Sequence, residues 1–163
     1  PDAVEDAPPS LVAMTAALTH PAYGLDRFWN ACCWNQSAAD LFAGWLGDGC
    51  QRNLLRYIFL DPEARRLIPD WEERARRALA EFRADYGHAH QDPRMKQMID
   101  ALSRDSALFA RVWKEQAVLD RHGGLRAFSH PAGGLLLYEQ HTLRPSDRPD
   151  CKLVVLISSQ PGP

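Results

Sequence analysis

Apolar residues recur along the chain with two different periods, and the change of period separates a helical middle from β-rich ends. Between residues 71 and 117 the apolar positions return every three to four residues, which predicts amphipathic helices. After Gly124 the period falls to two, which predicts strands over 125–129, 135–142 and 152–158. We therefore expect three C-terminal strands, the first two joined as a hairpin.

The N-terminal part alternates between short helical and short extended patterns. A helix is predicted over 11–18, with Ser10 as its N-cap, and His20-Pro21 ends it. Aromatic residues and alternation then predict strands over 23–28 and 31–34. A helix over 36–42 and a loop over 44–49 follow.

Polar residues mark the starts of the later helices. Asn35 and Asn53 stand directly before apolar helical runs, as N-caps do. Asp61 and Asp92 each precede a proline, which is favoured at the first helical position. Residue 105 or 106 would cap the last helix, so the helical middle divides into several short helices.

The element order predicts the fold class. Two N-terminal and three C-terminal strands with helices between them fit one antiparallel sheet of about five strands, with the helices packed on one face, an α+β fold. Such a sheet encloses an apolar space that either side chains or a ligand fills. Residues 1–9 are acidic and proline-rich, and we expect a disordered linker there, followed by one domain over 10–160.

Composition narrows the function classes. The 163 residues are 45% hydrophobic and 25% charged, an ordinary globular balance. The net charge of −2 argues against a domain that binds nucleic acid by itself, because such domains are basic. The longest aliphatic run, residues 153–157, is too short for a bilayer, which needs about 20 apolar residues.

The four cysteines do not have the spacing of a zinc site. We expect free thiols in a reducing cytoplasm. Cys32 and Cys33 are adjacent in a predicted strand, so their side chains are expected on opposite faces of the sheet.

Motifs for catalysis and for metal binding are weak or missing. The chain contains no G-x-S-x-G elbow, P-loop, dinucleotide fingerprint or H-E-x-x-H, so no enzyme activity and no cofactor are expected. His88, His90 and Asp92 resemble a metal cluster, but they fall at a helix end without a fourth ligand nearby in sequence. We therefore expect no metal site.

Five stretches carry a family resemblance in order and at fitting distances. They are residues 21–30 (PAYGLDRFWN), 34–39 (WNQSAA), 52–55 (RNLL), 70–72 (DWE) and 128–131 (FSHP), the last followed by Gly134. Together they resemble the MmyB-like transcription regulator ligand-binding domain over nearly the whole chain.

The resemblance implies a fold and a role. Domains of this family are PAS-like, follow a helix-turn-helix DNA-binding domain of the Xre type, and resemble fatty-acid-binding sensors. It implies a cytoplasmic transcription-regulation domain that binds a fatty-acid-like small molecule in an apolar pocket and signals to an attached DNA-binding domain. No helix-turn-helix precedes residue 10, so contact with DNA is expected only through such a domain. Cys32 and Cys33 stand where larger aliphatic residues are common, which bears on the width of the pocket.

Eight residues from the matched motifs and the apolar helix faces are candidate ligand contacts: Tyr23, Trp34, Asn35, Arg52, Asn53, Trp71, Trp113 and His130. Arg52 stands beside a helix start, where a guanidinium, free N–H groups and the helix dipole together suit a carboxylate. The alternative is that Asn53 only caps the helix while Arg52 lies in solvent.

The other candidates also have two interpretations. Asn35 is either only an N-cap or also offers its amide group to a ligand. Trp71 and Trp113 are either core residues or walls for an acyl chain. His130 precedes a proline at a hairpin, where a hydrogen-bonded turn residue is commoner than a ligand.

Two other functions stay open. The domain is alternatively a protein-interaction or dimerisation module with a side-chain-filled core, in which Leu11, Met14 and Leu18 would form a homodimer contact. A hydrolase acting on acyl substrates is the remote third option. No membrane partner is expected.

Overall fold

The computed structural model describes residues 6–47, 52–86, 91–115 and 124–159. Eight helices and five strands lie in this part of the chain. In chain order they are α1 (Pro9–Ala17), β1 (Ala22–Leu25), β2 (Ala31–Trp34), α2 (Gln36–Leu41), α3 (Ala43–Leu46), α4 (Leu54–Leu60), α5 (Pro62–Leu67), α6 (Trp71–Tyr86), α7 (Pro93–Asp105), α8 (Ala107–Glu115), β3 (Leu125–His130), β4 (Gly134–Leu143) and β5 (Lys152–Ser158).

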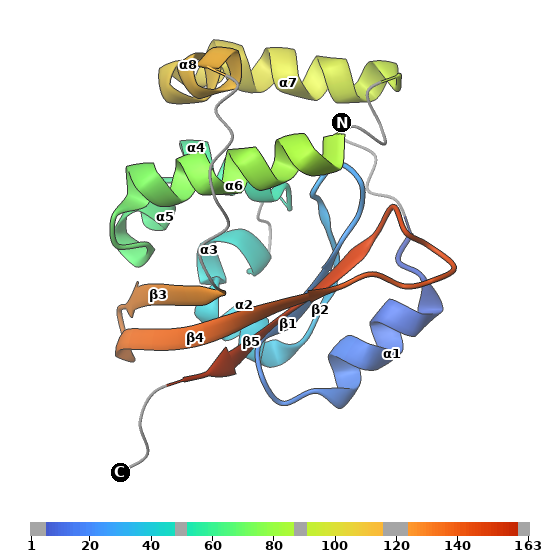
Figure 1. Ribbon diagram of the computed structural model, residues 1–163. Coiled ribbons are helices and arrows are strands. Elements are labelled where there is room, and N and C mark those ends of the chain that lie inside the picture. The colour runs from blue at the N-terminus through green and yellow to red at the C-terminus, as the bar shows by residue number, and fades with distance from the viewer. Residues whose placement is uncertain (1–5, 48–51, 87–90, 116–123, 160–163) are drawn as a thin grey trace.

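The strands form one antiparallel sheet in the order β2-β1-β5-β4-β3 (Figure 1). β1 pairs with β5, Ala22 opposite Val155, and this pairing joins the two ends of the chain. The expected sheet of two N-terminal and three C-terminal strands is therefore confirmed, and with it the PAS-like α+β class.

β1 is shorter than the predicted strand over 23–28 because a polar turn ends it. The Asp26 carboxylate accepts hydrogen bonds from the backbone N–H groups of Phe28, at 2.9 Å, and Asn30, at 3.0 Å. Trp29 completes the turn in the left-handed region, with φ of 65°. The turn brings the Trp29 indole beneath α6, where it packs edge-on against Phe82 at 5.4 Å.

β2 contains a β-bulge that the sequence pattern does not reveal. Gly24 pairs with Cys33, but the next residue of β1, Leu25, pairs with Ala31, so Cys32 is the extra residue. The expectation that Cys32 and Cys33 face opposite sides of the sheet is wrong, because the bulge interrupts the alternation. Both residues pack in the apolar cluster on the α1 side.

Most helices lie on one face of the sheet, which we call the inner face. Tyr23, Leu25, Val154 and Leu156 project from it into the main core, and the buried side of α6 covers them. α7 and α8 form a further layer above α6 (Figure 1).

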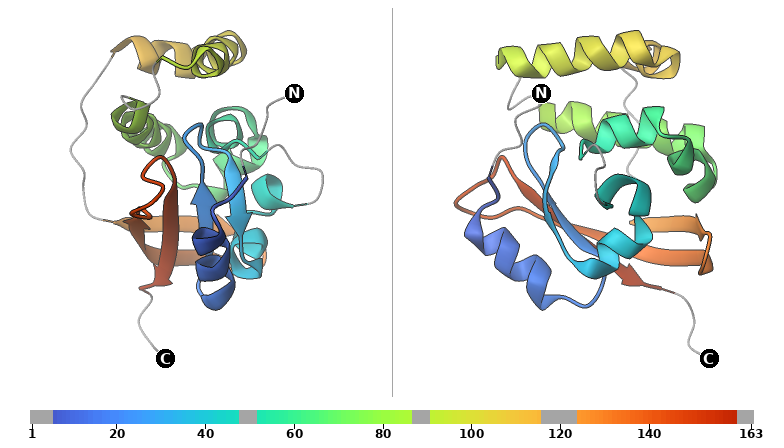
Figure 2. Two further views of the ribbon diagram at one scale, coloured as in Figure 1. Left: turned by 90° about the vertical axis from the view of Figure 1, so that its right-hand side faces the viewer. Right: turned by 180° about the vertical axis from the view of Figure 1, so that it is seen from behind.

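α1 departs from the expected one-sided arrangement. It packs on the opposite, outer face of the sheet (Figure 2). Leu11 of α1 belongs there to a separate apolar cluster with Leu153 and Val155. α1 carries no charged residue, and its solvent side includes Val12 and Met14. A helix that is apolar all round gives no signal for the face it buries.

The helix starts follow the predicted caps at most positions. Asn35, Asn53, Asp61 and Asp92 cap α2, α4, α5 and α7 through their side chains, and the Ser106 hydroxyl accepts from the third residue of α8 at 3.0 Å. Ser10 is not a cap, because α1 already begins with a proline at its first turn.

Two further predictions concern the loop after α2 and the candidate metal cluster. The loop expected over 44–49 begins as helix α3, because Trp45 and Leu46 bury their side chains in the core. His88 and His90 of the candidate metal cluster lie outside the described residues. Within the described ranges no helix has the length and apolar character needed to cross a membrane.

Candidate functional site

A pocket lies between the inner face of the sheet and the helices above it. Its cavity volume is about 100 Å³. The lining residues come from β1 and the turn after it, from α4 and α6, from the ends of α2 and α5, and from β3, β4 and β5. They are Tyr23, Leu25, Trp29, Phe42, Leu54, Tyr57, Ile58, Ile68, Arg74, Arg77, Ala78, Glu81, Arg126, Ala127, Phe128, Gln140, Lys152 and Val154. The walls are therefore mainly apolar and aromatic. The charged side chains among them are Arg74, Arg77, Glu81, Arg126 and Lys152.

One part of the pocket, which we call the arginine end, gathers Arg74, Arg77 and Glu81 of α6 and Arg126 of β3. Arg126 Nη2 lies 3.3 Å from Glu81 Oε1. Arg74 Nη2 donates to the Leu125 carbonyl oxygen at 2.8 Å. Arg77 Nε lies 3.0 Å from Glu73 Oε1, one turn earlier on the same helix.

Nearby carboxylates do not fully balance the positive charges of the arginine end. Burial, followed by the nearby Arg126 and Arg77, lowers the pKa of Arg74. Such a shift means that the positive form is disfavoured where it stands. A bound anion would reverse this, because an opposite charge nearby stabilises the guanidinium form.

Tyr23 stands between the apolar wall and the arginine end. Its ring packs edge-on against Trp45 at 4.8 Å and Phe42 at 5.8 Å. Burial, and then the nearby Glu81 carboxylate, raise the pKa of Tyr23, while Arg126 opposes them. The phenol therefore stays protonated and keeps a hydroxyl donor for a group in the pocket.

Lys152 and Trp29 also line a second cavity, of about 140 Å³, that is rich in charged groups. Lys152 Nζ donates to Asp85 Oδ2 at 2.9 Å and lies 4.2 Å from the centre of the Trp29 ring. Trp29 Nε1 donates to the same oxygen at 3.0 Å, and Arg144 reaches Oδ1 at 2.6 Å. Burial alone would raise the pKa of Asp85, but these partners outweigh it and lower the pKa.

Of the eight sequence-predicted contacts, Tyr23 is the one that lines the pocket. Asn35 has its side-chain groups engaged elsewhere. Its Oδ1 accepts from Ala38 N at 3.0 Å, which caps α2, and from Ala22 N. Its Nδ2 donates to the carbonyl oxygens of Leu18 and His20. The amide thus fastens the α1–β1 connection to α2, and both of its N–H groups already have acceptors.

Arg52 and Trp34 meet each other rather than the pocket. The Arg52 guanidinium donates to the carbonyl oxygens of Trp45, at 3.3 Å, and Gly47, at 2.6 Å. It also lies 4.6 Å from the centre of the Trp34 ring. These contacts give the guanidinium a structural role at the end of α3, which neither sequence interpretation contained.

Asn53 is almost fully buried and joins α4 to the first β-turn. Its Oδ1 accepts from Arg56 N at 3.1 Å, and its Nδ2 donates to Phe28 O at 2.8 Å and Asn30 Oδ1 at 3.0 Å. The side chain therefore both caps the helix and holds the turn.

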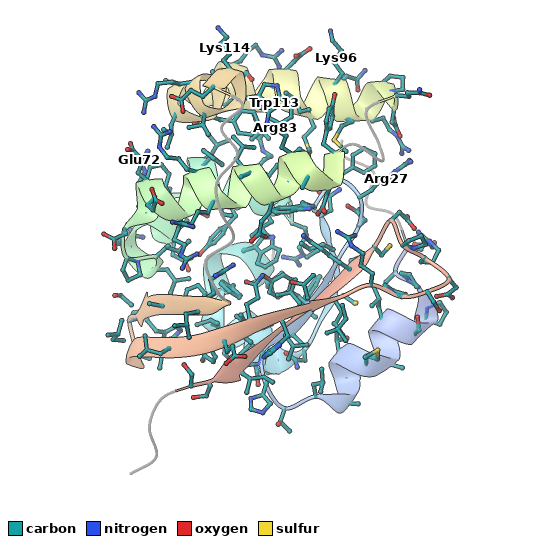
Figure 3. The ribbon with its side chains drawn as sticks, in the orientation of Figure 1. Arg27, Glu72, Arg83, Lys96, Trp113 and Lys114 are labelled. Carbon is teal, nitrogen blue, oxygen red and sulfur yellow. The ribbon has the colours of Figure 1, made fainter. Side chains whose placement is uncertain are left out.

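The two tryptophans lie in helix contacts outside the pocket lining. Trp71 is half-buried, donates from Nε1 to Ile58 O at 2.7 Å and lies under Arg65. Trp113 stacks on Phe109 at 6.0 Å and lies with Arg83 between α6 and α8 (Figure 3). These contacts support their interpretation as packing residues.

His130 acts as a turn residue. Its Nδ1 accepts from the backbone N–H groups of Ala132, at 3.1 Å, and Gly133, at 3.2 Å. Its Nε2 lies 2.9 Å from the Asp40 carbonyl oxygen. This set of partners requires the neutral tautomer with the proton on Nε2, which then donates to Asp40.

Sequence reasoning missed the arginine end, although one signal for it was present. Strand alternation over 125–129 puts Arg126 on the same face as the buried Phe128. A charged side chain on an otherwise core-facing row marks a candidate site. Arg74 and Glu81 carry no such mark, because they lie on a helix surface rich in other charges.

Comparison with known proteins adds an assignment to this geometry. No curated protein matches the chain. The sequence model of the MmyB-like transcription regulator ligand binding domain matches residues 7–162, which includes every strand of the sheet and the whole pocket lining. The chain therefore belongs to the MmyB-like transcription regulator ligand-binding domain family.

Proposed function

We propose that this ligand-binding domain is a sensor for a fatty-acid-like carboxylate, which enters the inner-face pocket and signals to an attached DNA-binding domain. The observation that carries the proposal is the arginine end of an otherwise apolar pocket. Arg126 and Arg74 would hold the carboxylate, and the neutral Tyr23 hydroxyl would donate to it. The apolar walls would receive the chain, and no catalytic step is assigned.

The size of the pocket supports a mechanism for the signal. A cavity of about 150 Å³ holds a benzene molecule, so the 100 Å³ available here takes only a short part of an acyl chain. A longer chain has to displace wall residues such as Leu54 and Ile58 on α4. A ligand shifts a conformational equilibrium by its difference in affinity for the two states, and displaced α4 is the state that the ligand would favour.

Calorimetric titration with decanoate and with decanol tests the carboxylate contact. Arg126→Gln should weaken decanoate binding about ten-fold or more, because a charge-assisted hydrogen bond contributes about 1.5–3 kcal/mol. Decanol should lose much less, since it offers no negative charge. Arg52→Gln is the matched control, because the Arg52 guanidinium bonds to backbone carbonyls outside the pocket lining.

The Arg52→Gln control also decides which arginine, Arg126 or Arg52, holds the carboxylate. Circular dichroism on both variants separates lost binding from lost folding. An equal loss for acid and alcohol with Arg126→Gln, or a selective loss of decanoate with Arg52→Gln, would contradict the assignment to the arginine end.

One observation supports the alternative of a dimerisation module. Exposed apolar residues lie on the outer face in two places: Val12, at 46% exposed, and Met14, at 44%, on α1, and Leu125, at 62%, and Leu135, at 57%, on β3 and β4. A second copy of the domain is the partner that this alternative assigns to them.

A further inference from the structure

Three cysteines gather beneath α1, far from the arginine end. Cys32, Cys33 and Cys151 belong to the outer-face cluster that Leu11 covers. The bulge in β2 turns Cys32 and Cys33 toward one place, above Gly24. A side-chain carbon built on Gly24 would lie 2.8 Å from Cys33 Sγ and 3.4 Å from Cys32 Sγ. Both sulfur atoms therefore lie beside the same residue of β1, on one side of the sheet.

The surroundings of the pair favour a thiolate on Cys33. The neighbouring Cys32 thiol lowers the pKa of Cys33 to about 7, against the effect of burial, with help from the Gly24 N–H. Burial raises the pKa of Cys151 to about 11. Cys32 and Cys33 are only partly buried, whereas Cys151 is fully buried. A reagent can therefore reach the pair, and Cys33 is its nucleophile.

We propose that Cys32 and Cys33 form a redox-active thiol pair, which a hydroperoxide oxidises to a reversible disulfide between the two residues. In the first step the Cys33 thiolate attacks the terminal peroxide oxygen and breaks the O–O bond. Cys33 becomes a sulfenic acid, and the peroxide leaves as water or an alcohol after taking up a proton. In the second step the Cys32 sulfur attacks the sulfenic sulfur, which releases water and forms the S–S bond. The two thiols lose two electrons, and the peroxide gains them.

The geometry makes this disulfide a switch rather than a structural bond. Neighbouring Cα atoms are about 3.8 Å apart across a trans peptide, whereas disulfides usually join Cα atoms about 4.4–6.8 Å apart. Closure therefore strains the bulge, and a strained disulfide is easily reduced. The same Gly24 position lies 3.2 Å from Leu11 Cδ1, so movement of the sulfur atoms disturbs the contact that holds α1.

The first experiment is hydrogen peroxide treatment followed by intact-protein and peptide mass spectrometry. The Cys50→Ser variant is the background, since Cys50 lies outside the described residues. We expect the protein to lose the mass of two hydrogen atoms, with the bond mapped to the peptide that holds both Cys32 and Cys33, and dithiothreitol should reverse it. Cys151→Ser should behave identically. Cys32→Ser should instead accumulate a dimedone-reactive sulfenic acid on Cys33.

A second measurement keeps the proposal testable if oxidation is slow. At pH 6, iodoacetamide should modify Cys33 about five-fold faster in the folded protein than in urea, because the larger thiolate fraction outweighs its lower nucleophilicity. Circular dichroism checks that each serine variant folds. A disulfide to Cys151, or a Cys33 that reacts more slowly when folded than when unfolded, would overturn the proposal.

Discussion

The two faces of the sheet are covered by side chains of different size. The inner face supports a large aromatic core, in which Trp45, Phe82 and Phe109 are fully buried beneath several helices. The outer face carries small residues, including Ala22, Gly24 and the cysteines, under a single helix of nine residues. The inner face therefore buries large rings among many neighbours, whereas the outer face depends on the packing of one short helix.

The difference explains why the two proposals concern different chemistry. A pocket with apolar walls and a cationic end suits an amphipathic ligand. On the outer face Cys33 lies beside Gly24 and is only partly buried, which suits a covalent change at its sulfur. The faces share β1 and β5, so a disturbance on either side acts on the same two strands.

The largest expected difference between the faces is in stability. Trp45→Ala should lower the free energy of unfolding by about 3–5 kcal/mol, because the ring is fully buried and its Nε1 donates to Arg52 O at 2.7 Å. Leu11→Ala should cost about 2 kcal/mol, the low end for a buried leucine, because α1 can settle toward the sheet. Urea unfolding monitored by circular dichroism measures both. A larger loss for Leu11→Ala would show that the outer cluster, not the inner core, dominates folding.

Local signals explain what the sequence predicted well. The five strands and most helix starts follow from alternation and from caps such as Asn53, which need only neighbouring residues. The bulge at Cys32 depends on the register between β1 and β2, and the side on which α1 packs depends on contacts with β5. Neither is encoded in a short stretch of sequence.

The same reasoning applies to the candidate site. The sequence favoured Arg52 as the carboxylate partner and assigned no such role to Arg126. Long-range contacts distinguish them, because the Arg52 guanidinium reaches the carbonyl oxygens at the end of α3, whereas Arg126 pairs with Glu81 in the pocket lining. Only the fold therefore indicated which of these arginines lines the pocket.

An intermediate effect on the free energy of unfolding should come from the charged cluster around Asp85 of α6. Asp85→Asn removes a carboxylate that accepts from Trp29, Lys152 and Arg144, and should cost about 2 kcal/mol at neutral pH. Because the pKa of Asp85 is lowered in the folded state, its contribution is complete above the unfolded value of about 3.9. It is lost as the pH falls through the lower folded value.

The stability difference between wild type and Asp85→Asn should therefore shrink below about pH 4, as measured by urea unfolding at several pH values. Asp100→Asn is the matched control. Asp100 lies on α7, is 55% exposed and pairs with Lys96 at 3.6 Å, so its loss should change stability by less than about 0.5 kcal/mol at any pH. A pH-independent difference for Asp85→Asn would mean that shape, not charge, holds the cluster together.

The smallest expected effect is at Met14, on the solvent side of α1. Met14→Ser should change the free energy of unfolding by less than about 0.5 kcal/mol, because the side chain is 44% exposed and stands apart from the covered row of Leu11 and Thr15. Sedimentation equilibrium on the same two proteins tests the dimer alternative. An unliganded dimer that Met14→Ser dissociates would make the outer face an interface. A wild-type monomer that binds decanoate would favour the sensor and leave the exposed side of α1 without that role.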